Sequence, residues 1–437
     1  MAKHERYSTY KDSASHWFGE IPSHWDLKPL KYLASINDEK LADSTDRDEV
    51  IEYVDIGNVT LQQGICGSET LSFEKAPSRA RRIVRDGDSI VSTVRTYLKA
   101  IAPIKQPPPN LIVSTGFAVI RPRALDPGYL SYHLQSSNFV EDVVSRSVGV
   151  SYPAINPTEI AEIELLQPLL EEQQAISAWL DERTARIDTL IAKKQRLIEL
   201  LQEKRQAIIS KAVTRGLDPH VKLKDSGIQW LGEVPEHWEV KRLKHLLNMP
   251  LQYGANEAAE QDDEDQPRFI RITDIDGSGN LRQETFRSLP EEIARPFLLE
   301  DGDLLFARSG ATVGKTFLYS NTWGRAAYAG YLIRARFNPM LVFSQFMHWY
   351  ASSYQYWQWL HSNAIQATIQ NVSADKYNNL WVPLPPIHEQ RSILQTIQSE
   401  LDRLDRLSIK AATALDHLKE YRSSLISAAV TGQIKVC

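Results

Sequence analysis

Cysteine and long apolar runs are almost absent from this sequence, and each absence excludes a class of protein. The 437 residues include only two cysteines, Cys66 and Cys437, which rules out a disulfide framework or a cysteine-rich zinc site and suits a reducing compartment. No apolar run approaches the roughly 18 residues that a membrane-spanning helix needs. The first twenty residues are charged and polar and contain no apolar signal core. We therefore expect a cytoplasmic protein without a membrane segment.

The sequence also lacks an excess of positive charge. Its formal net charge is −5, with 42% apolar and 24% charged residues, which is an ordinary globular composition and excludes a largely disordered chain. A protein that coats nucleic acid without sequence preference would be basic, so any nucleic-acid surface must be local or completed by a partner. A chain of this length predicts two or more domains.

No catalytic motif is complete. Residues 310–316, GATVGKT, resemble a phosphate-binding loop but place three residues between the glycines where four are required. The favoured alternative is a glycine-rich turn that presents Ser309 and Lys315 to a phosphate. His388-Glu389 lacks the second histidine of a zinc-protease helix. We therefore predict no catalytic residue and no metal ligand in this chain, and a binding or scaffold role.

The chain contains the same pattern twice. Residues 17–33, WFGEIPSHWDLKPLKYL, and residues 230–246, WLGEVPEHWEVKRLKHL, are identical at ten of seventeen positions. Three further segments recur at offsets of 215 to 217 residues, namely 86–88 at 301–303, 169–174 at 386–391, and 204–214 at 421–431. Because the offset grows by only four residues, the sequence is a two-fold repeat of whole domains and not a solenoid of short period.

Each copy of the first motif contains a Pro-x-His-Trp turn. His24 and His237 occupy the same position in the two copies, and Trp25 and Trp238 follow them. A structural role in the turn is favoured for the histidines over a catalytic one. The tryptophans are predicted to anchor the core.

Each copy ends in a long stretch with the apolar spacing of a coiled coil. Prolines precede both stretches, which predicts helices within 168–215 and 383–437. The favoured interpretation is that the two helices pair antiparallel within the chain as a spacer; alternatively, each covers its own domain or pairs between chains. Apolar residues recur at alternating spacings of mainly three and four residues: Leu180, Ile187, Ile191, Ile198, Leu201 and Ile208 in the first stretch, and Ile397, Leu401, Leu404, Leu415, Leu418 and Leu425 in the second.

The regions between the repeated motifs, 34–167 and 247–382, differ in sequence between the copies. Each is predicted to be an α+β domain with a curved mixed sheet, because short β-rich runs come first and helical patterns follow. The predicted strands are 50–56, 82–84, 89–94, 111–113 and 117–120 in the first copy, and 268–272, 303–307, 315–319 and 331–337 in the second; the predicted helices are 127–145 and 340–360. The predicted organisation is a domain over 1–167, a helix over 168–215, a linker and second domain over 216–382, and a helix over 383–437.

Basic residues gather at matching places in the two variable regions. Residues 71–105 carry eight basic and three acidic residues. A solvated strand face would explain one such cluster, but two at the same repeat position favour contact with phosphates and base edges. The basic residues of the second cluster are Arg308, Lys315, Arg325, Arg334 and Arg336.

In combination, these motifs resemble the specificity (S) subunit of type I restriction–modification systems. The resemblance rests on the W-x-G-E-x-P-x-H-W opening of each half, the Asp-Gly-Asp turn, the PLPPIHEQ-type entry to a long helix, and the R-x-x-x-I-S-x-A-V-T helix ending. It covers nearly the whole chain in the order of the family. The first copy departs slightly, with QPLLEEQ where the second has PLPPIHEQ.

The resemblance implies a non-catalytic DNA-recognition subunit. Each variable region would be a target recognition domain for one half of a split, asymmetric site on double-stranded DNA, and the paired helices would set the gap between the halves. Two methyltransferase subunits, which use S-adenosylmethionine, and restriction subunits, which use ATP and Mg²⁺, would be the partners; this chain itself would bind no cofactor. The competing interpretations are a coiled-coil scaffold of another assembly that does not bind DNA, and an NTPase that uses 310–316.

The candidate DNA-binding residues lie in turns of the two variable regions. Arginine, glutamine and asparagine suit base edges, and lysine suits phosphates. The candidates are Arg95, Thr96, Lys99, Ser147, Ser151 and Tyr152 in the first region, and Arg308, Ser309, Thr312, Lys315, Gln370 and Asn371 in the second.

Overall fold

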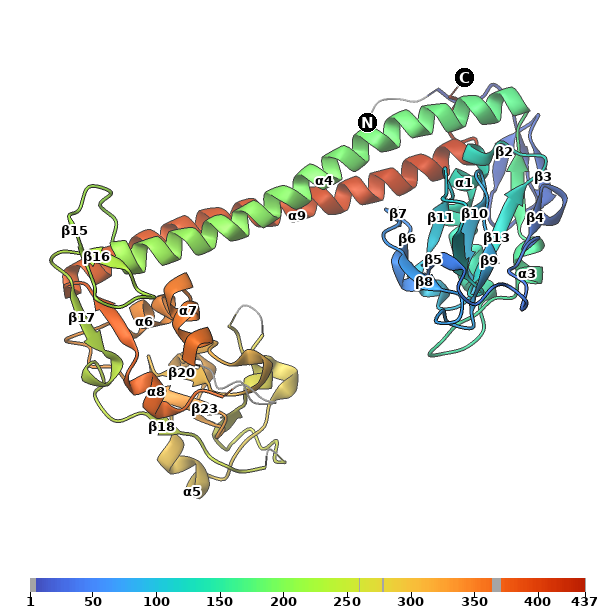
Figure 1. Ribbon diagram of the computed structural model, residues 1–437. Coiled ribbons are helices and arrows are strands. Elements are labelled where there is room, and N and C mark those ends of the chain that lie inside the picture. Colours follow the sequence, from blue (N-terminus) through green and yellow to red (C-terminus); the bar gives the residue numbers. More distant parts are fainter. Residues whose placement is uncertain (1–4, 259, 277–278, 364–370, 437) are drawn as a thin grey trace. The chain divides into compact units, whose positions relative to one another are not determined.

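The computed structural model describes residues 5–258, 260–276, 279–363 and 371–436 (Figure 1). The chain forms two compact units. The first unit comprises Met1–Arg196 and Ala411–Cys437, and the second comprises Leu197–Lys410. Both are α+β, and the mixed helix and strand content agrees with the prediction from sequence.

The first unit contains two four-stranded sheets. One is antiparallel, in the order β11 (Ile101–Pro103), β10 (Ser89–Ser92), β13 (Phe117–Pro122) and β4 (Ala34–Ile36). The other is mixed, because β5 and β12 run parallel, in the order β8 (Glu69–Ser72), β5 (Val50–Val54), β12 (Leu111–Ser114) and β9 (Ala80–Ile83).

Two-stranded pairings and short helices complete the first unit. The pairings are β1 (Tyr10–Asp12) with β2 (Glu20–Pro22), β3 (Asp26–Pro29) with β14 (Glu164–Gln167), and β6 (Val59–Thr60) with β7 (Gly64–Ile65). The helices are α1 (Pro127–Leu134), α2 (Ser137–Arg146) and α3 (Pro157–Ala161). The β3–β14 pair joins the repeated opening motif to the strand just before the long helix, so it closes the domain.

The second unit repeats this plan. Its four-stranded antiparallel sheet has the order β18 (Gln252–Tyr253), β23 (Leu332–Ala335), β20 (Leu304–Ala307) and β21 (Thr316–Leu318). The pairings are β15 (Leu223–Asp225) with β16 (Glu233–Pro235), β17 (Glu239–Arg242) with β24 (Trp381–Leu384), and β19 (Arg268–Ile270) with β22 (Ala326–Tyr328). The helices are α5 (Glu291–Ala294), α6 (Ser344–Tyr350), α7 (Tyr354–Asn363) and α8 (Ala374–Asn378).

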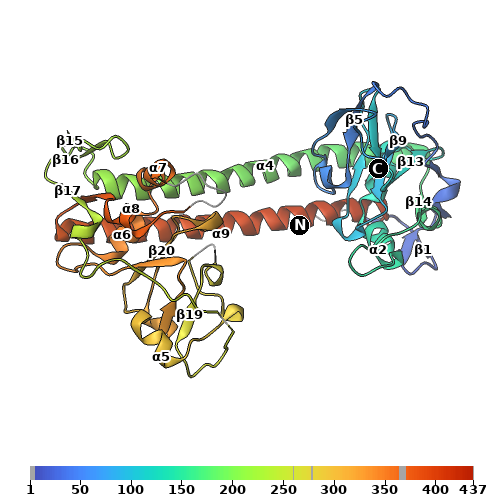
Figure 2. The ribbon, with the colours of Figure 1, turned by 60° about the horizontal axis from the view of Figure 1, so that its bottom comes forward.

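The predicted long helices are α4 (Leu170–Arg215) and α9 (Ile387–Val430), which lie side by side in both views (Figures 1 and 2). All twelve predicted seam residues are buried or half-buried. In the first unit Arg422 donates to Asp188 at 2.8 Å, and in the second Arg205 donates to Asp405 at 2.5 Å. These two ion pairs are related by the 217-residue repeat, and they confirm antiparallel pairing within the chain. No described helix is long and apolar enough to cross a membrane.

A Glu-Gln pair in the first turn of each long helix contacts the domain beside it. Glu389 accepts from the fully buried Trp238 indole at 3.0 Å and lies 2.8 Å from His237 Nε2. Gln390 is buried, accepts from the Phe343 N–H and donates to backbone carbonyls. The histidine therefore has the structural role that the repeat predicted.

The first unit repeats the histidine and glutamine contacts but not the indole hydrogen bond, because Trp25 Nε1 is buried without a partner among the described residues. His24 Nε2 lies 3.0 Å from Glu172. Gln173 is buried, accepts from the Asp126 N–H and donates to the Pro168 carbonyl. In each unit the histidine of the Pro-x-His-Trp turn thus contacts the glutamate of the Glu-Gln pair.

The repeated Asp-Gly-Asp turn is held by a buried ion pair. Asp88 accepts from Nε and a terminal nitrogen of Arg121 at 2.9 and 2.8 Å. Asp303 accepts from Arg336 in the same way, at 2.8 and 2.7 Å. Both aspartates are 1% exposed. The ion pair therefore fixes the turn that leads into β10 in the first unit and into β20 in the second. Arg336, which the sequence placed in the second basic cluster, is engaged in this internal ion pair.

Replacing Glu389 with alanine should destabilise the second unit. The Trp238 indole N–H would stay buried without its acceptor, which costs about 1–3 kcal/mol. We expect the free energy of unfolding to fall by this amount in denaturant titrations. Glu389→Gln retains a carbonyl acceptor and should recover most of the loss. Equal losses for both variants would show that the indole contact is not what stabilises the helix start.

A buried histidine makes the first unit sensitive to acid. His133 lies in α1 and accepts from the Leu166 N–H at 3.1 Å through Nε2. Burial lowers the pKa of His133 from its ordinary 6.5 to about 4. The folded unit therefore holds the neutral ring, while the unfolded chain takes up a proton below pH 6.5.

This shift predicts that stability is full above pH 6.5 and is lost as the pH falls towards 4. The loss from His133 amounts to about 3 kcal/mol at most, because each pKa unit corresponds to about 1.4 kcal/mol. His133→Gln keeps an acceptor for Leu166 but does not titrate. The melting temperature of this variant should fall less between pH 7 and pH 4.5 than that of the unaltered protein. An equal fall would assign the acid sensitivity to other groups.

Candidate nucleic-acid interface

In the first unit, two loops meet at the end of β10, a strand of the antiparallel sheet. The loop after β10 contains the short 3₁₀ helix Thr96–Leu98, and the second loop joins α2 to α3. Val94 and Ala154 form a β-bridge between them, and the Thr96 hydroxyl donates to Ser147 Oγ at 2.7 Å. All six residues predicted for this domain therefore lie in these two joined loops.

The six residues differ in the solvent exposure of their side chains. Arg95, Lys99 and Ser151 are exposed, and Tyr152 is 66% exposed. The Arg95 guanidinium lies over the Tyr152 ring, 4.9 Å from its centroid. Thr96 is only 3% exposed, and its hydroxyl is already paired with the half-buried Ser147. These two residues hold the loops together, and their contact with DNA stays a prediction.

The same two loops also expose apolar side chains, which were not among the candidates predicted from the sequence. Tyr97, Leu98, Val148 and Val150 are all exposed in the same two loops. They follow no helical or strand period, so only the folded loops show that they share a surface.

The second unit brings its candidate residues together at the end of β20. Ser309 and Asn371 form a β-bridge, and Arg308 Nε lies 3.4 Å from Asn371 Oδ1. The Arg308 guanidinium lies over the ring of Tyr253, 4.5 Å from its centroid. Tyr253 was not predicted, because it is 55 residues away in the sequence.

The remaining candidates of the second unit flank this group. Lys315 is exposed, and Thr312 is half-buried at the end of the 3₁₀ helix Gly310–Thr312. Both line a hollow of about 650 Å³ that also includes His348 and Trp357. Gln370 lies outside the described residues.

Equivalent hydrogen bonds match the two loops residue by residue. The Ile155 N–H donates to Thr93, as the Val372 N–H donates to Arg308. The next residues continue the match, because Val94 forms a β-bridge with Ala154 as Ser309 does with Asn371. Thr93 therefore corresponds to Arg308, and the two loops share one backbone with different side chains.

This match places two basic residues where the other copy has glycine. Arg95 and Lys99 have φ of +52° and +51°, and the corresponding Gly310 and Gly314 have φ of +77° and +83°. A side chain in this left-handed region costs roughly 1–2 kcal/mol. Strained residues of this kind concentrate at functional sites, so the first unit holds two exposed cations at positions that favour glycine.

Many of the other cations in the two predicted basic clusters already have partners. Arg79 pairs with Asp55 and Arg85 pairs with Glu39. Arg325 pairs with Glu291, and Arg334 donates to the Gln252 side chain at 2.6 Å. Within the described residues, no ion pair involves Arg95, Lys99, Arg308 or Lys315. These four cations of the two loop surfaces are therefore not neutralised by a described carboxylate.

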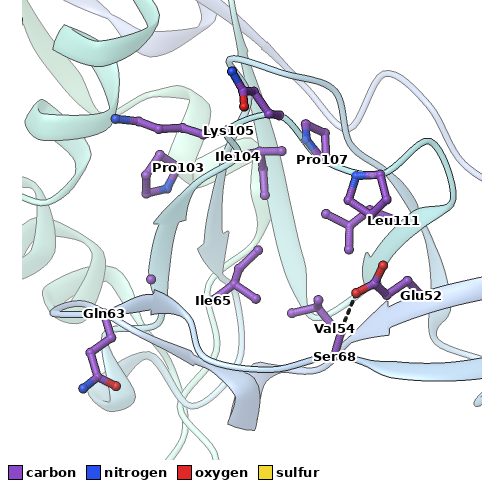
Figure 3. Close-up of a pocket in the computed structure, with 13 residues that line it drawn as sticks. Glu52, Val54, Gln63, Ile65, Ser68, Pro103, Ile104, Lys105, Pro107 and Leu111 are labelled. Atoms are coloured by element: carbon purple, nitrogen blue, oxygen red, sulfur yellow. Dashed lines mark hydrogen bonds between the residues drawn. The ribbon is translucent and has the colours of Figure 1, made fainter.

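A separate hollow of about 340 Å³ lies beside β5 and β12 in the first unit. Figure 3 shows Val54, Ile65 and Leu111 along its wall. Its one carboxylate, Glu52, accepts from Ser68 Oγ at 2.5 Å. The described part of the chain contains no group of carboxylate, histidine and cysteine side chains that could hold a metal ion.

Comparison with known proteins gives the family. Residues 22–200 and 235–415 each match the type I restriction modification DNA specificity domain, so the chain belongs to this family, as its motifs indicated. It is 25% identical over 321 residues to the type I restriction enzyme MjaVIII specificity subunit of Methanocaldococcus jannaschii, with 72% of each chain covered.

Two solved structures share the fold. A chain from a structure of a type I R-M system superimposes with a TM-score of 0.74 at 21% identity, covering 94% of this chain and 98% of that one. The HsdS subunit from Thermoanaerobacter tengcongensis has a TM-score of 0.51 at 21% identity, covering 95% of this chain and 98% of that one.

Exchanging residues at the left-handed positions should reveal the strain. Arg95→Gly should leave the free energy of unfolding unchanged or raise it by up to about 1 kcal/mol, because glycine has no Cβ to clash. Gly310→Ala should lower it by about 1 kcal/mol, since its Cβ would meet nothing within 4 Å and only backbone strain remains. Thermal melts of both variants provide the measurement. A clear loss for Arg95→Gly would mean that the arginine stabilises the fold.

Proposed function

We propose that this chain is the DNA-recognition subunit of a type I restriction–modification complex. Each unit recognises one half of a bipartite site on double-stranded DNA through the loop surface at the end of its sheet. The observation that carries the proposal is the duplication of this surface, on one backbone plan, with different side chains in the two units. Membership of the specificity-domain family supports it.

The side chains of the two surfaces suit an asymmetric site. The first presents Arg95, Lys99 and Tyr152 among apolar residues, and the second presents Arg308, Asn371 and Lys315. Arginine and asparagine form paired hydrogen bonds with the major-groove edges of purines, and apolar groups contact the thymine methyl. Because the two sets differ, the two half-sites differ in sequence.

The long helices provide the surface for partner subunits. Leu190 and Leu407 are 47% and 45% exposed and are related by the 217-residue repeat. Exposed leucines at repeat-related positions of two helices suit two copies of one partner. We assign this surface to two methyltransferase subunits, with restriction subunits joining the complex.

The chemistry belongs to the partners in this proposal. The chain is non-catalytic, S-adenosylmethionine binds the methyltransferase, and ATP and Mg²⁺ bind the restriction subunits. A methyltransferase must turn its adenine out of the duplex, so this chain has to hold the DNA in register during that step. Partner cations also complete the phosphate contacts that a chain of net charge −5 does not supply alone.

Co-expression with the neighbouring methyltransferase, followed by mapping of methylated adenines across genomic DNA, tests the proposal. We expect one bipartite motif with a gap of fixed length and unspecified sequence. Expression of the methyltransferase alone is the control and should give no such motif. If the two proteins form no complex, or methylation follows no split motif, the chain is a scaffold of another assembly instead.

A further inference from the structure

Each of the two recognition surfaces contains an arginine that lies over a tyrosine ring. Arg95 lies over Tyr152 in the first unit, and Arg308 lies over Tyr253 in the second. Neither arginine takes part in an ion pair with a described carboxylate. Their terminal nitrogens are therefore not engaged by any acidic partner in the described parts of the chain.

The two pairs arise from different places in the repeat. Arg95 sits in the left-handed turn position that is Gly310 in the second unit, whereas Arg308 sits at the position of Thr93. Tyr152 comes from the loop after α2, whereas Tyr253 comes from β18. Duplication of a common ancestor would have placed both pairs at matching positions. The two arginine–tyrosine contacts are therefore not equivalent positions of the repeat, although both lie in the recognition loops or beside them.

Stacking fixes an arginine without using its hydrogen-bond donors. The ring contacts the face of the guanidinium, while all five N–H groups point outward in the guanidinium plane. Arg308 directs Nε towards Asn371, and its two terminal nitrogens remain for a ligand. Tyr253 is itself fixed, because its hydroxyl accepts from the Ala374 N–H at 2.9 Å.

A fixed, planar fork of two donors matches one base edge in the major groove. Guanine presents two acceptors, N7 and O6, at the spacing that arginine spans. Adenine presents one acceptor and one donor, so a second arginine donor would face an N–H group. A lysine or a freely rotating arginine would contact a phosphate as well as a stacked arginine does. Contact with phosphate alone would therefore not require the tyrosine ring.

Building on the proposed function, we propose that Arg95 and Arg308 each recognise a guanine in their half-site, and that Tyr152 and Tyr253 are positioning residues that give these contacts their base specificity. Tyr253 and the stacked geometry extend the set of specificity-determining residues beyond the turn residues. Lys99 and Lys315 lie outside the stacks and serve phosphates.

The test measures base discrimination by the complex with its methyltransferase, once the motif is known. Binding is titrated against the cognate duplex and against duplexes in which each G·C pair of the first half-site is replaced in turn. Arg95→Ala and Tyr152→Ala should both lose discrimination at the same single G·C pair, by roughly 5- to 150-fold. Tyr152→Phe keeps the ring and should keep the discrimination. Arg308→Ala should act likewise at one G·C pair of the second half-site.

The outcomes that contradict this inference differ from those that contradict the proposed function. If Arg95→Ala weakens binding to every duplex equally and lowers the salt dependence, Arg95 contacts a phosphate, and this inference fails while the proposed function stands. A half-site without any G·C pair also overturns the inference alone. Absence of a bipartite motif overturns both. Tyr152 is largely exposed, so its variants should fold, and unchanged melting temperatures would exclude a structural explanation of the loss.

Discussion

The Glu-Gln pair in the first turn of each long helix is the contact on which the rest of each unit depends. Glu389 binds the repeated opening turn through Trp238 and His237, and Gln390 binds the segment before α6 through the Phe343 N–H. A single helical turn thus joins both the opening turn and the segment before α6 to the helix. Both glutamines are buried, so their amides cannot exchange these partners for water without a penalty.

This constraint explains which residues the duplication kept and which it changed. The Glu-His contacts, the Asp-Arg pairs under the Asp-Gly-Asp turn, and the Arg-Asp pairs between the helices recur in both units. The loops at the end of the sheet kept their backbone but exchanged side chains, as Arg95 and Gly310 show. Because the internal contacts hold the loop backbone, side chains on it can change without loss of the fold.

Sequence predicted the features that have a period or a repeat. The seam of α4 and α9 follows heptad spacing, and the repeat located the matching turns. The pairing of β3 with β14 was missed, because these strands are about 135 residues apart and neither has an apolar alternation. The segment 127–145 was predicted as one helix but is two, since the Ser136 side chain caps α2 by accepting from the Phe139 N–H.

The recognition surface was harder to predict, because a sequence lists cations without their partners. Arg336 and Arg308 look alike in the sequence, yet the first is held by a buried aspartate and the second lies on Tyr253. Arg95, Lys99, Arg308 and Lys315 are the candidate cations on the two loop surfaces, and none of them forms an ion pair with a described carboxylate. If recognition proceeds as proposed, such a surface contributes little non-specific affinity, and its few base contacts set the specificity. This division between base contacts and phosphate contacts suits a subunit that selects a site while its partners supply most of the phosphate contacts.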